Sequence, residues 1–402
     1  MESDNKLFLL DAYALIYRAY YAFIKNPRIN SKGFNTSAIL GFVNTLEEVL
    51  KKENPTHIGV AFDPAGPTFR HEAFEQYKAQ REETPEAIRL SVPIIKEIIR
   101  AYRIPILEVA GYEADDVIGT LATEAGRQGI ITYMMTPDKD YGQLVSDKVF
   151  MYRPKHTGGF EVMGVDEVKA KFDIQSPAQV IDMLGLMGDS SDNIPGCPGV
   201  GEKTAQKLIA EFGSIENLLE HTDQLKGALK TKVETNREMI TFSKFLATIK
   251  IDVPIQLDMD SLVREQADED SLRQIFEELE FRTLIDRVLK KENAGNGITT
   301  PTGNKTAAEK SNLAPLPLFP EEGGAVQGDL FANFTGNEPG EAKNSNLATL
   351  ETLNCDYQLI DTEEKRTKII QKLLTSKILS LDTETTGTEP MDAELVGMSF
   401  SI

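Results

Sequence analysis

Three short apolar runs in the first half of the chain each end on an aspartate, and stretches with helical periodicity separate them. The runs cover residues 6–11, 57–63 and 130–138. Continuous apolar segments of this length predict buried parallel strands of an α/β sheet flanked by helices. Ligands of such sheets bind beyond the carboxyl ends of the strands, so we expect three aspartates to share one sheet edge. They are Asp11, Asp63 and Asp138.

Helix signals follow the strands. Thr84, Pro85 and Glu86 supply an N-cap, a proline at the first helical position and an early acid. Apolar residues then recur at helical spacing as far as Tyr102. The alternation of strands and helices predicts an α/β core over residues 1–180.

The second half of the chain divides by composition. A hairpin rich in Gly and Pro over residues 194–201 precedes a helical pattern, which predicts an all-α helix-hairpin-helix subdomain over 181–290. Residues 291–346 are rich in Gly, Pro, Asn, Thr, Ala and Glu with little periodicity, which indicates a disordered linker. Strand and helix patterns return over 347–402. Because the chain stops within the last strand pattern, we expect the truncated start of a further domain.

The composition limits the possible classes of protein. The chain has 402 residues, no Trp and two Cys, and neither its acidic start nor any apolar run matches a signal peptide or a membrane span. We therefore expect a soluble, cytoplasmic protein. Cys197 and Cys355 have no Cys/His cluster near them, which argues against a disulfide framework or a zinc site. The net charge of -20 is unusual for a nucleic-acid binder, but bound metal ions would neutralise part of it.

The string GYEADDV (111–117) places three carboxylates within four residues, directly before a helical pattern. Acids in a first helical turn complement the helix dipole by ~0.3 to 1 kcal/mol each, which explains one or two of the three. A divalent cation such as Mg²⁺ or Mn²⁺ would turn the mutual repulsion of all three into shared attraction. On this stretch alone both interpretations stay open.

Two further acidic strings, TPDKD (136–140) and GDSSD (188–192), favour the metal interpretation. Together with the three acids of GYEADDV and the strand-end Asp11 and Asp63, they give nine acids at one expected sheet edge, more than a single Mg²⁺ needs. Two ions roughly 3.5 to 4 Å apart fit better, because such a pair generates hydroxide and clamps both oxygens of a phosphodiester displacement. The alternative is a Ca²⁺-binding or simply acidic surface, although the EF-hand pattern is absent. The nine acids are Asp11, Asp63, Glu113, Asp115, Asp116, Asp138, Asp140, Asp189 and Asp192.

Three strings resemble the 5′ nuclease domain of bacterial DNA polymerase I, a relative of the flap endonucleases, over residues 5–290. They are GYEADDVIGTLA, TPDKD and LMGDSSDNIPGCPGVGEKTAQKLI. The strings ILSLDTETTG and ELVGMSFSI resemble the first strands of the 3′-5′ proofreading exonuclease domain of the same polymerase. The resemblance implies a PIN-like parallel sheet with a helical arch. It also implies a structure-specific 5′-3′ exonuclease or flap endonuclease that removes flaps and RNA primers. Such a protein would be cytoplasmic and associated with the nucleoid.

The resemblance further implies a role for each acid. One metal would be surrounded, directly or through water, by Asp11, Asp63, Glu113, Asp115 and Asp116. The second metal would be held by Asp138, Asp140, Asp189 and Asp192. The sequence departs from the family pattern at Pro137, where Gly is usual, and at Glu82, where Pro is usual. Pro137 removes a backbone donor beside Asp138, which affects the geometry of the second site.

Cationic and aromatic residues recur near helical spacing in the string TFRHEAFEQYKAQR, which starts at Thr68. From the residues alone, they could be a solvated helix face with a tyrosine at the edge of the core. The resemblance instead implies that Lys78 and Arg81 contact the scissile phosphate and that Tyr77 stacks on a terminal base. Arg70 and Arg18 are further candidates for contacts with DNA phosphates.

The string GCPGVGEKT is not a P-loop, because Glu202 interrupts the required Gly-Lys-Ser/Thr. In a helix-hairpin-helix, glycines let backbone N–H groups approach a DNA phosphate without reading sequence, and a lysine adds charge at the helix start. An ordinary connection between helices is the alternative. The candidate DNA-binding residues are Gly196, Gly199, Gly201 and Lys203. The resemblance also implies a K⁺ ion bound by carbonyl groups of this loop.

Two smaller features and two competing functions complete the predictions. Asp382 and Glu384 lie two apart on a predicted strand and would belong to an incomplete proofreading site. Gln327, Leu330 and Phe331 resemble the linker peptide by which bacterial polymerases dock on the sliding clamp.

A PIN-type endoribonuclease would share the acids but lack the helix-hairpin-helix. A non-catalytic DNA-junction module would not need nine carboxylates.

Overall fold

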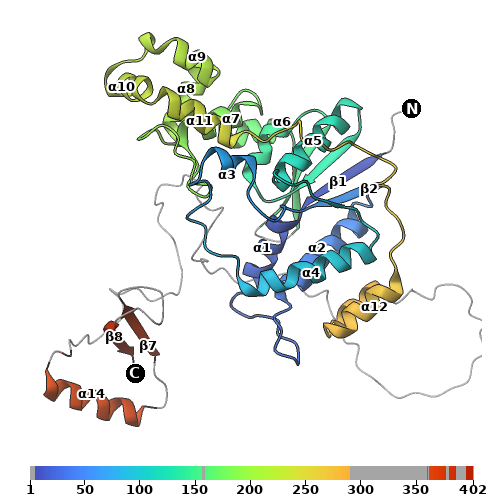
Figure 1. The fold of residues 1–402 in the computed structure, drawn as a ribbon, viewed down its shortest axis with the longest axis vertical. Helices are drawn as coiled ribbons and strands as arrows, with labels where there is room; N and C mark the ends of the chain where they lie inside the picture. Colours follow the sequence, from blue (N-terminus) through green and yellow to red (C-terminus); the bar gives the residue numbers. More distant parts are fainter. Residues whose placement is uncertain are drawn as a thin grey trace, which may run out of the picture. The chain divides into compact units, whose positions relative to one another are not determined.

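The computed structural model describes residues 5–155, 159–289, 360, 362–376, 380–385 and 395–401. The chain forms two compact units, residues 1–334 and 335–402. The first unit is built on a six-stranded sheet with helices on both faces (Figure 1).

The strand order of this sheet is β3-β2-β1-β4-β5-β6. The first five strands run parallel and β6 runs antiparallel to β5. The strands are β1 (Lys6–Asp11), β2 (His57–Ala61), β3 (Ile106–Leu107), β4 (Ile131–Met135), β5 (Val149–Pro154) and β6 (Phe160–Met163). In register, Asp11 pairs with Ala61 and Leu10 pairs with Met135. The predicted parallel sheet is confirmed, and its strands β1, β2 and β4 end at or just before the three aspartates.

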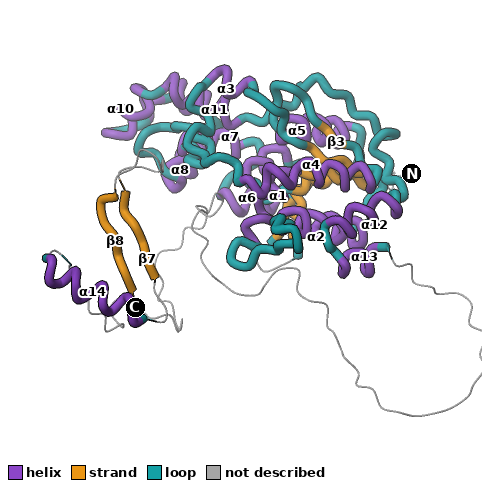
Figure 2. The backbone as a smooth tube through the Cα atoms, turned by 60° about the horizontal axis from the view of Figure 1, so that its bottom comes forward, coloured by secondary structure: helices purple, strands orange, loops and turns teal. Residues whose placement is uncertain are grey.

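Alternate residues of β1 enter different hydrophobic clusters, because successive side chains of a strand point to opposite faces. Leu7 and Leu9 pack on the side of α5 (Ala114–Arg127), whereas Phe8 and Leu10 pack on the other side. The second face is covered by α1 (Ala12–Ala22), α2 (Ser37–Lys52), α4 (Glu86–Ala101), α12 (Glu269–Glu278) and α13 (Arg282–Val288) (Figure 2). Because both faces are covered, β1 reads as a continuous apolar run.

The helices α12 and α13 follow the helical region in sequence but return to the α/β core. Leu272 and Phe276 of α12 are fully buried in the cluster that contains Phe8. On the way, the backbone N–H of Ile58 in β2 donates to the carbonyl oxygen of Leu262 at 2.9 Å. The predicted helical subdomain over 181–290 therefore includes a segment that completes the core of the α/β part.

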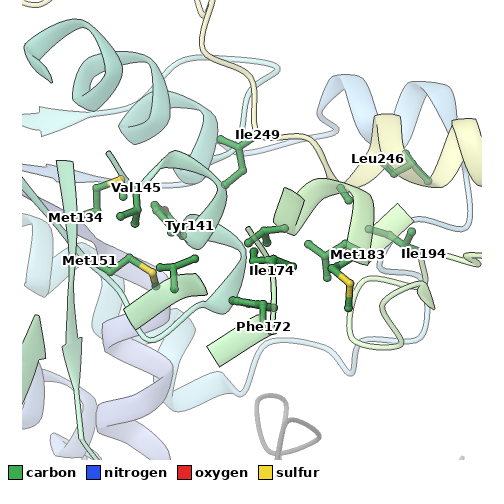
Figure 3. Close-up of a cluster of buried hydrophobic side chains, with 14 of the residues drawn as sticks. Met134, Tyr141, Val145, Met151, Phe172, Ile174, Met183, Ile194, Leu246 and Ile249 are labelled. Atoms are coloured by element: carbon green, nitrogen blue, oxygen red, sulfur yellow. The ribbon is translucent and has the colours of Figure 1, made fainter. Parts of the chain in front are cut away.

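The helical region comprises α6 (Val165–Phe172), α7 (Gln179–Met187), α8 (Glu202–Phe212), α9 (Ile215–Glu220), α10 (Gly227–Thr235) and α11 (Arg237–Ala247). Its apolar side chains are continuous with those on the α5 side of the sheet. One cluster extends from Met134 and Met151 in the strands through Phe172 to Met183 and Leu246 (Figure 3). The helical pattern predicted to follow the hairpin over 194–201 is confirmed as α8.

The segment between β2 and α4 differs from the prediction. Helix α3 covers only Phe69–Ala73, and residues 74–85 are turns and coil. Lys78 has a φ of 56°, which lies in the left-handed region and does not occur within a right-handed helix. The near-helical spacing of Tyr77, Lys78 and Arg81 therefore does not correspond to a helix in the structure. The helix predicted to follow Pro85 is confirmed as α4.

The second unit contains α14 (Glu363–Thr375) and the antiparallel pair β7 (Ser380–Thr385) and β8 (Leu395–Ser401), which confirms the predicted helix and strand pattern. The side chains of Asp382 and Glu384 on β7 lie outside the described residues. The predicted linker over 291–346, with Gln327, Leu330 and Phe331, also lies outside them. In the part of the chain that the structure describes, no helix is both long and apolar enough to cross a membrane.

Candidate active site

The strand-end aspartates lie at the carboxyl edge of the sheet, where Asp11 is held from two sides. Its Oδ2 accepts hydrogen bonds from the Tyr141 hydroxyl at 3.0 Å and the Thr136 hydroxyl at 3.3 Å. Its Oδ1 caps the first turn of α1. Burial raises the pKa of Asp11 to about 7, and the charges of Asp63 and Asp138 contribute to this shift. These three acids therefore share one electrostatic environment.

Helix α5 begins with the acidic string predicted from the sequence. Carboxylate oxygens of Glu113, Asp115 and Asp116 lie within 4.8 Å of one another. Asp116 Oδ2 accepts from the Glu113 backbone N–H at 3.1 Å, so capping and the helix dipole account for part of the cluster. Burial and the charge of Asp116 raise the pKa of Asp115 well above its ordinary value. A divalent cation would relieve this repulsion.

Asp63 connects the strand ends with the start of α5. Its Oδ1 accepts a hydrogen bond from the Ala114 backbone N–H at 2.7 Å. Burial raises the pKa of Asp63, the Lys78 charge opposes this rise, and the Glu113 charge adds to it. Asp63 therefore belongs to the same group of acids as Glu113.

A second group of carboxylates comes from the loop after β4 and the turn after α7. Asp138 Oδ1 accepts from the Asp140 backbone N–H at 3.0 Å, and Asp189 Oδ2 pairs with Lys139 Nζ at 2.7 Å. Asp140 Oδ1 is buried and has no hydrogen-bond partner among the described residues. Burial and the charges of Asp138 and Asp189 raise the pKa of Asp140 well above its ordinary value. A buried, unpartnered carboxylate oxygen surrounded by other acids fits a ligand of a cation.

Lys78 and Arg81 lie against acids from both groups. Lys78 Nζ is 2.7 Å from Glu113 Oε1 and 3.8 Å from Asp192 Oδ2. Arg81 Nη2 is 2.5 Å from Asp192 Oδ1, and its Nε donates to the Ser191 carbonyl at 3.1 Å. Burial alone would raise the pKa of Asp192, but the charges of Lys78 and Arg81 keep it below its ordinary value. The loop thus places two cations at the edge of the carboxylate group.

Tyr77 does not take the position predicted for it. The residue is 3% exposed, and its hydroxyl lies within hydrogen-bond distance of Glu113 Oε2 at 3.0 Å and of Asp192 Oδ2 at 3.1 Å, so its one proton is shared between the two acids. His71 packs edge-on against its ring at a centroid distance of 5.2 Å. Because the ring is enclosed, it offers no face to a DNA base in this conformation. The hydroxyl instead holds two of the acids.

The two candidate arginines also lie differently from what the sequence suggested. Arg70 is 1% exposed and pairs with Glu113 at 3.0 Å and Asp116 at 2.8 Å, so the prediction that it contacts a DNA phosphate is wrong for this structure. Arg18 lies on α1, and its Nη2 donates to the carbonyl oxygen of Lys155 at 3.0 Å. Among the described residues, no hydrogen bond joins Arg18 to any of the nine acids.

The turn after α7 requires glycine at two positions. Gly188 ends the helix with a φ of 74°, and Asp189 and Ile194 then exchange backbone hydrogen bonds of 2.9 and 2.8 Å. Gly196 has a φ of 62°, and a Cβ there would overlap the backbone of Gly188. Because a side chain fits at neither position, the turn that carries Asp189 depends on both glycines.

The hairpin continues into α8, as the helix-hairpin-helix pattern predicted. Gly201 directly precedes the helix, and Lys203 is exposed in its first turn. The Gly199 carbonyl accepts a hydrogen bond from Lys232 Nζ at 3.3 Å. The hairpin therefore presents glycine backbone next to two lysines.

Sequence reasoning missed three residues that hold the acids. Tyr141 and Thr136 donate to Asp11, and Lys139 pairs with Asp189. All three flank or belong to the TPDKD string, and Tyr141 lies in the 3₁₀ helix η1 (Lys139–Leu144). Their position beside the predicted ligands is the signal that could have identified them.

The chain is similar in sequence to DNA polymerase I of several bacteria. DNA polymerase I of Bacillus caldotenax is 42% identical over 287 residues, which cover 71% of this chain and 32% of that protein. DNA polymerase I of Chloroflexus aurantiacus is 35% identical over 399 residues, covering 98% of this chain and 40% of that protein. The chain thus matches less than half the length of these relatives.

A solved structure of T5 5′-exonuclease with bound divalent zinc ions superposes with a TM-score of 0.51 at 21% identity. The match covers 69% of this chain and 99% of that chain. At this level of identity the likeness establishes the fold alone.

Two family models match consecutive parts of the chain. The N-terminal resolvase-like domain of 5′-3′ exonuclease matches residues 6–173, and the C-terminal SAM fold of 5′-3′ exonuclease matches residues 175–270. The first spans the sheet with its strand-end acids, and the second spans the hairpin and most of the helical region. The chain therefore belongs to the 5′-3′ exonuclease family.

Proposed function

We propose that this chain is a structure-specific 5′ nuclease that works as part of a DNA polymerase I. It would hydrolyse DNA phosphodiesters at 5′ flaps, nicks and RNA-primed ends, leaving a 5′-phosphate and a 3′-hydroxyl. The observation that carries the proposal is a group of nine carboxylates whose charges act on one another near the ends of β1, β2 and β4, with Lys78 and Arg81 against them. Family membership and the names of the relatives support it.

Two Mg²⁺ or Mn²⁺ ions are the cofactors that this donor set fits. The unpartnered Asp140 oxygen and the raised pKa values of Asp11, Asp115 and Asp140 support cation binding. Bound ions would lower the pKa of the attacking water and neutralise charge on the phosphate. The first ion would take Asp11, Asp63, Glu113 and Asp115, with Asp116 behind them. The second would take Asp138, Asp140, Asp189 and Asp192.

The two cations of the loop over 74–85, Lys78 and Arg81, would contact the DNA. Lys78 and Arg81, once separated from Glu113 and Asp192, would donate to the scissile phosphate as negative charge grows on it. Tyr77 would keep Glu113 and Asp192 in place through its hydroxyl.

The helix-hairpin-helix would hold the duplex by its backbone. The N–H groups near Gly196, Gly199 and Gly201, with Lys203, would contact phosphates without reading sequence. A K⁺ ion bound by hairpin carbonyls is part of this proposal, and the Gly199 carbonyl already accepts a cationic donor. Arg18 would contribute a further phosphate contact. The presence of this motif favours a DNA nuclease over a PIN-type endoribonuclease.

Two parts of the proposal rest on sequence alone. Gln327, Leu330 and Phe331 would dock on a sliding clamp, and calorimetry with a peptide of residues 320–336 tests this contact. The protein would act in the cytoplasm at the nucleoid.

Cleavage of a labelled 5′-flap duplex with Mg²⁺, with and without chelator, tests the function. Asp115→Asn and Asp189→Asn should each abolish cleavage and change flap-DNA affinity in Ca²⁺ by less than about threefold, because each removes a metal ligand but no phosphate contact. Asp147→Asn, on an exposed loop, is the matched control and should cleave like the wild type. Wild-type turnover by both active-site variants would refute the two-metal proposal.

A further inference from the structure

Arg70, on α3, is a fully buried arginine whose hydrogen-bonding capacity is used up. Its Nη1 donates to Glu113 Oε2 at 3.0 Å and Asp116 Oδ2 at 2.8 Å, and its Nη2 donates to Asp116 Oδ1 at 2.8 Å. Nη2 also donates to the Thr248 carbonyl and Nε to the Leu246 carbonyl, both at 2.9 Å. A guanidinium carries five N–H groups, and all five are engaged. Arg70 can therefore act on the site only through these hydrogen-bond partners and through its charge beside Asp115, whose Oδ1 lies 3.9 Å from Nη1.

The two carboxylate oxygens of Glu113 have different kinds of partner. Oε2 accepts from Arg70 Nη1 and from the Tyr77 hydroxyl, both at 3.0 Å, and both donors are buried. Oε1 accepts from Lys78 Nζ at 2.7 Å, and the Lys78 side chain is 19% exposed on the loop over 74–85. A buried donor is costly to remove, whereas a solvent-accessible ammonium can be exchanged. Oε2 is thus fixed, and Oε1 is the oxygen available to another cation.

Asp116 is satisfied without a metal ion. Its two oxygens take the bidentate pair from Arg70, and they also accept from the backbone N–H groups of Lys250 at 2.8 Å and Glu113 at 3.1 Å. Four donors occupy the four lone-pair positions of a carboxylate. Asp116 therefore holds Arg70, and Arg70 in turn holds Glu113.

We propose that Arg70 is a positioning residue of the metal centre, which fixes Glu113 through Oε2 and leaves Oε1 for a divalent ion. This inference rests on the proposed function of the carboxylate group. Through the Leu246 and Thr248 carbonyls, the same guanidinium ties the end of α11 to the start of α5. The helical region and the acids are thereby joined at one side chain.

The variant Arg70→Lys tests the proposal, because it keeps the charge but cannot supply the planar fork that meets Asp116 and Glu113 together. Mn²⁺ affinity, measured without DNA by the paramagnetic resonance signal of free Mn²⁺, should fall by ~10-fold or more, as expected when a partner of a metal ligand is lost. Arg264→Lys is the matched control. Arg264 donates to the Leu50 carbonyl and Asn54 Oδ1 on another part of the molecule, and its replacement should leave Mn²⁺ affinity unchanged.

Flap-DNA binding in Ca²⁺ separates positioning from DNA contact. Because lysine keeps the charge, this test uses the neutral variant Arg70→Gln. A buried Arg70 neutralises no phosphate, so the slope of log affinity against log salt concentration should be the same in Arg70→Gln and the wild type. If Arg70 contacted a phosphate, the slope would become shallower by about 0.9 in Arg70→Gln, and the proposal would be overturned.

Tyr77→Phe provides a second variant that keeps the buried ring and removes the other donor to Oε2. It should weaken Mn²⁺ binding in the same direction, by ~3-fold. If Arg70→Lys does not fold, Tyr77→Phe decides alone. Wild-type Mn²⁺ affinity in every folded variant would overturn the proposal even if the wild type cleaves flaps. A wild type that binds Mn²⁺ but does not cleave would refute the proposed function and leave the comparison of variants valid.

Discussion

At the scale of single residues, the carboxylates of the site fall into two classes. Asp11, Asp115 and Asp140 have raised pKa values, chiefly because of burial and then because of neighbouring acids. Burial would also raise the pKa values of Glu113 and Asp192, but Lys78 and its neighbouring arginines lower them. The acids themselves were predictable because they lie in compact strings at expected strand ends. Their partners were not, since which acid meets Lys78 depends on a loop with no repeating pattern.

The raised pKa of Asp11 predicts that the metal-free protein loses stability as the pH rises. The folded state binds this proton with a pKa of about 7, compared with an ordinary value of 3.8. Between about pH 4 and pH 7 the folded chain therefore holds more protons than the unfolded chain, and the free energy of unfolding falls with pH. In calorimetry with chelator, Tm should drop by on the order of 5 °C from pH 5 to pH 8.

Asp11→Asn is the control for this effect, because asparagine keeps the cap of α1 without the ionisable group. The variant should show a flatter decline of Tm with pH than the wild type. Addition of Mg²⁺ at pH 8 should restore Tm in the wild type, since a ligand that binds only the folded state stabilises it. An equal pH slope in both proteins would contradict the assignment to Asp11.

At the scale of elements, periodicity predicted the strands and α8 correctly but failed for residues 74–85. The spacing of Tyr77, Lys78 and Arg81 imitates a helix, whereas their conformation is set by contacts that are distant in sequence. The Lys78 backbone N–H donates to the Asp192 carbonyl at 3.0 Å, and Asn193 Nδ2 donates to the Gln76 carbonyl at 2.7 Å. No local pattern encodes this pairing of a loop with the turn after α7.

Because the loop over 74–85 is held partly by acids of the site, we predict that divalent ions release this loop from the turn after α7. A divalent ion bound by Glu113 Oε1 and the Asp192 oxygens would repel the positive charges of Lys78 and Arg81 and weaken their ion pairs with these acids. Saturating Ca²⁺ should therefore speed amide hydrogen exchange at Lys78 and Arg81 by roughly tenfold, because local opening costs less free energy. The amide of Ile99, buried in α4, serves as the control and should not change. Unaltered exchange at the loop would show that ions bind without displacing the two cations.

At the scale of the whole molecule, the nuclease unit is one packed body rather than a core with an attached helical subdomain. Hydrophobic contacts continue from the sheet into the helical region, as Figure 3 shows, and the chain then returns to cover the opposite face with α12 and α13. Sequence patterns predicted the helices but not this return, because an amphipathic helix records that one face is buried and not which surface buries it. The position of α12 had to come from the structure.

Because α12 packs against the α/β core, we predict that removing a buried side chain of α12 lowers stability but leaves the cleavage rate unchanged. Leu272 is fully buried in the cluster around Phe8, on the face of the sheet opposite α5, whereas Leu90 of α4 is 49% exposed. Leu272→Ala should therefore lower the free energy of unfolding in urea by about 2 to 5 kcal/mol, and Leu90→Ala by less than about 0.5 kcal/mol. Below its melting range, Leu272→Ala should still cleave flap DNA at close to the wild-type rate, because no acid of the site contacts α12 through a hydrogen bond of the described residues. A cost similar to that of Leu90→Ala would mean that α12 does not complete this core in solution.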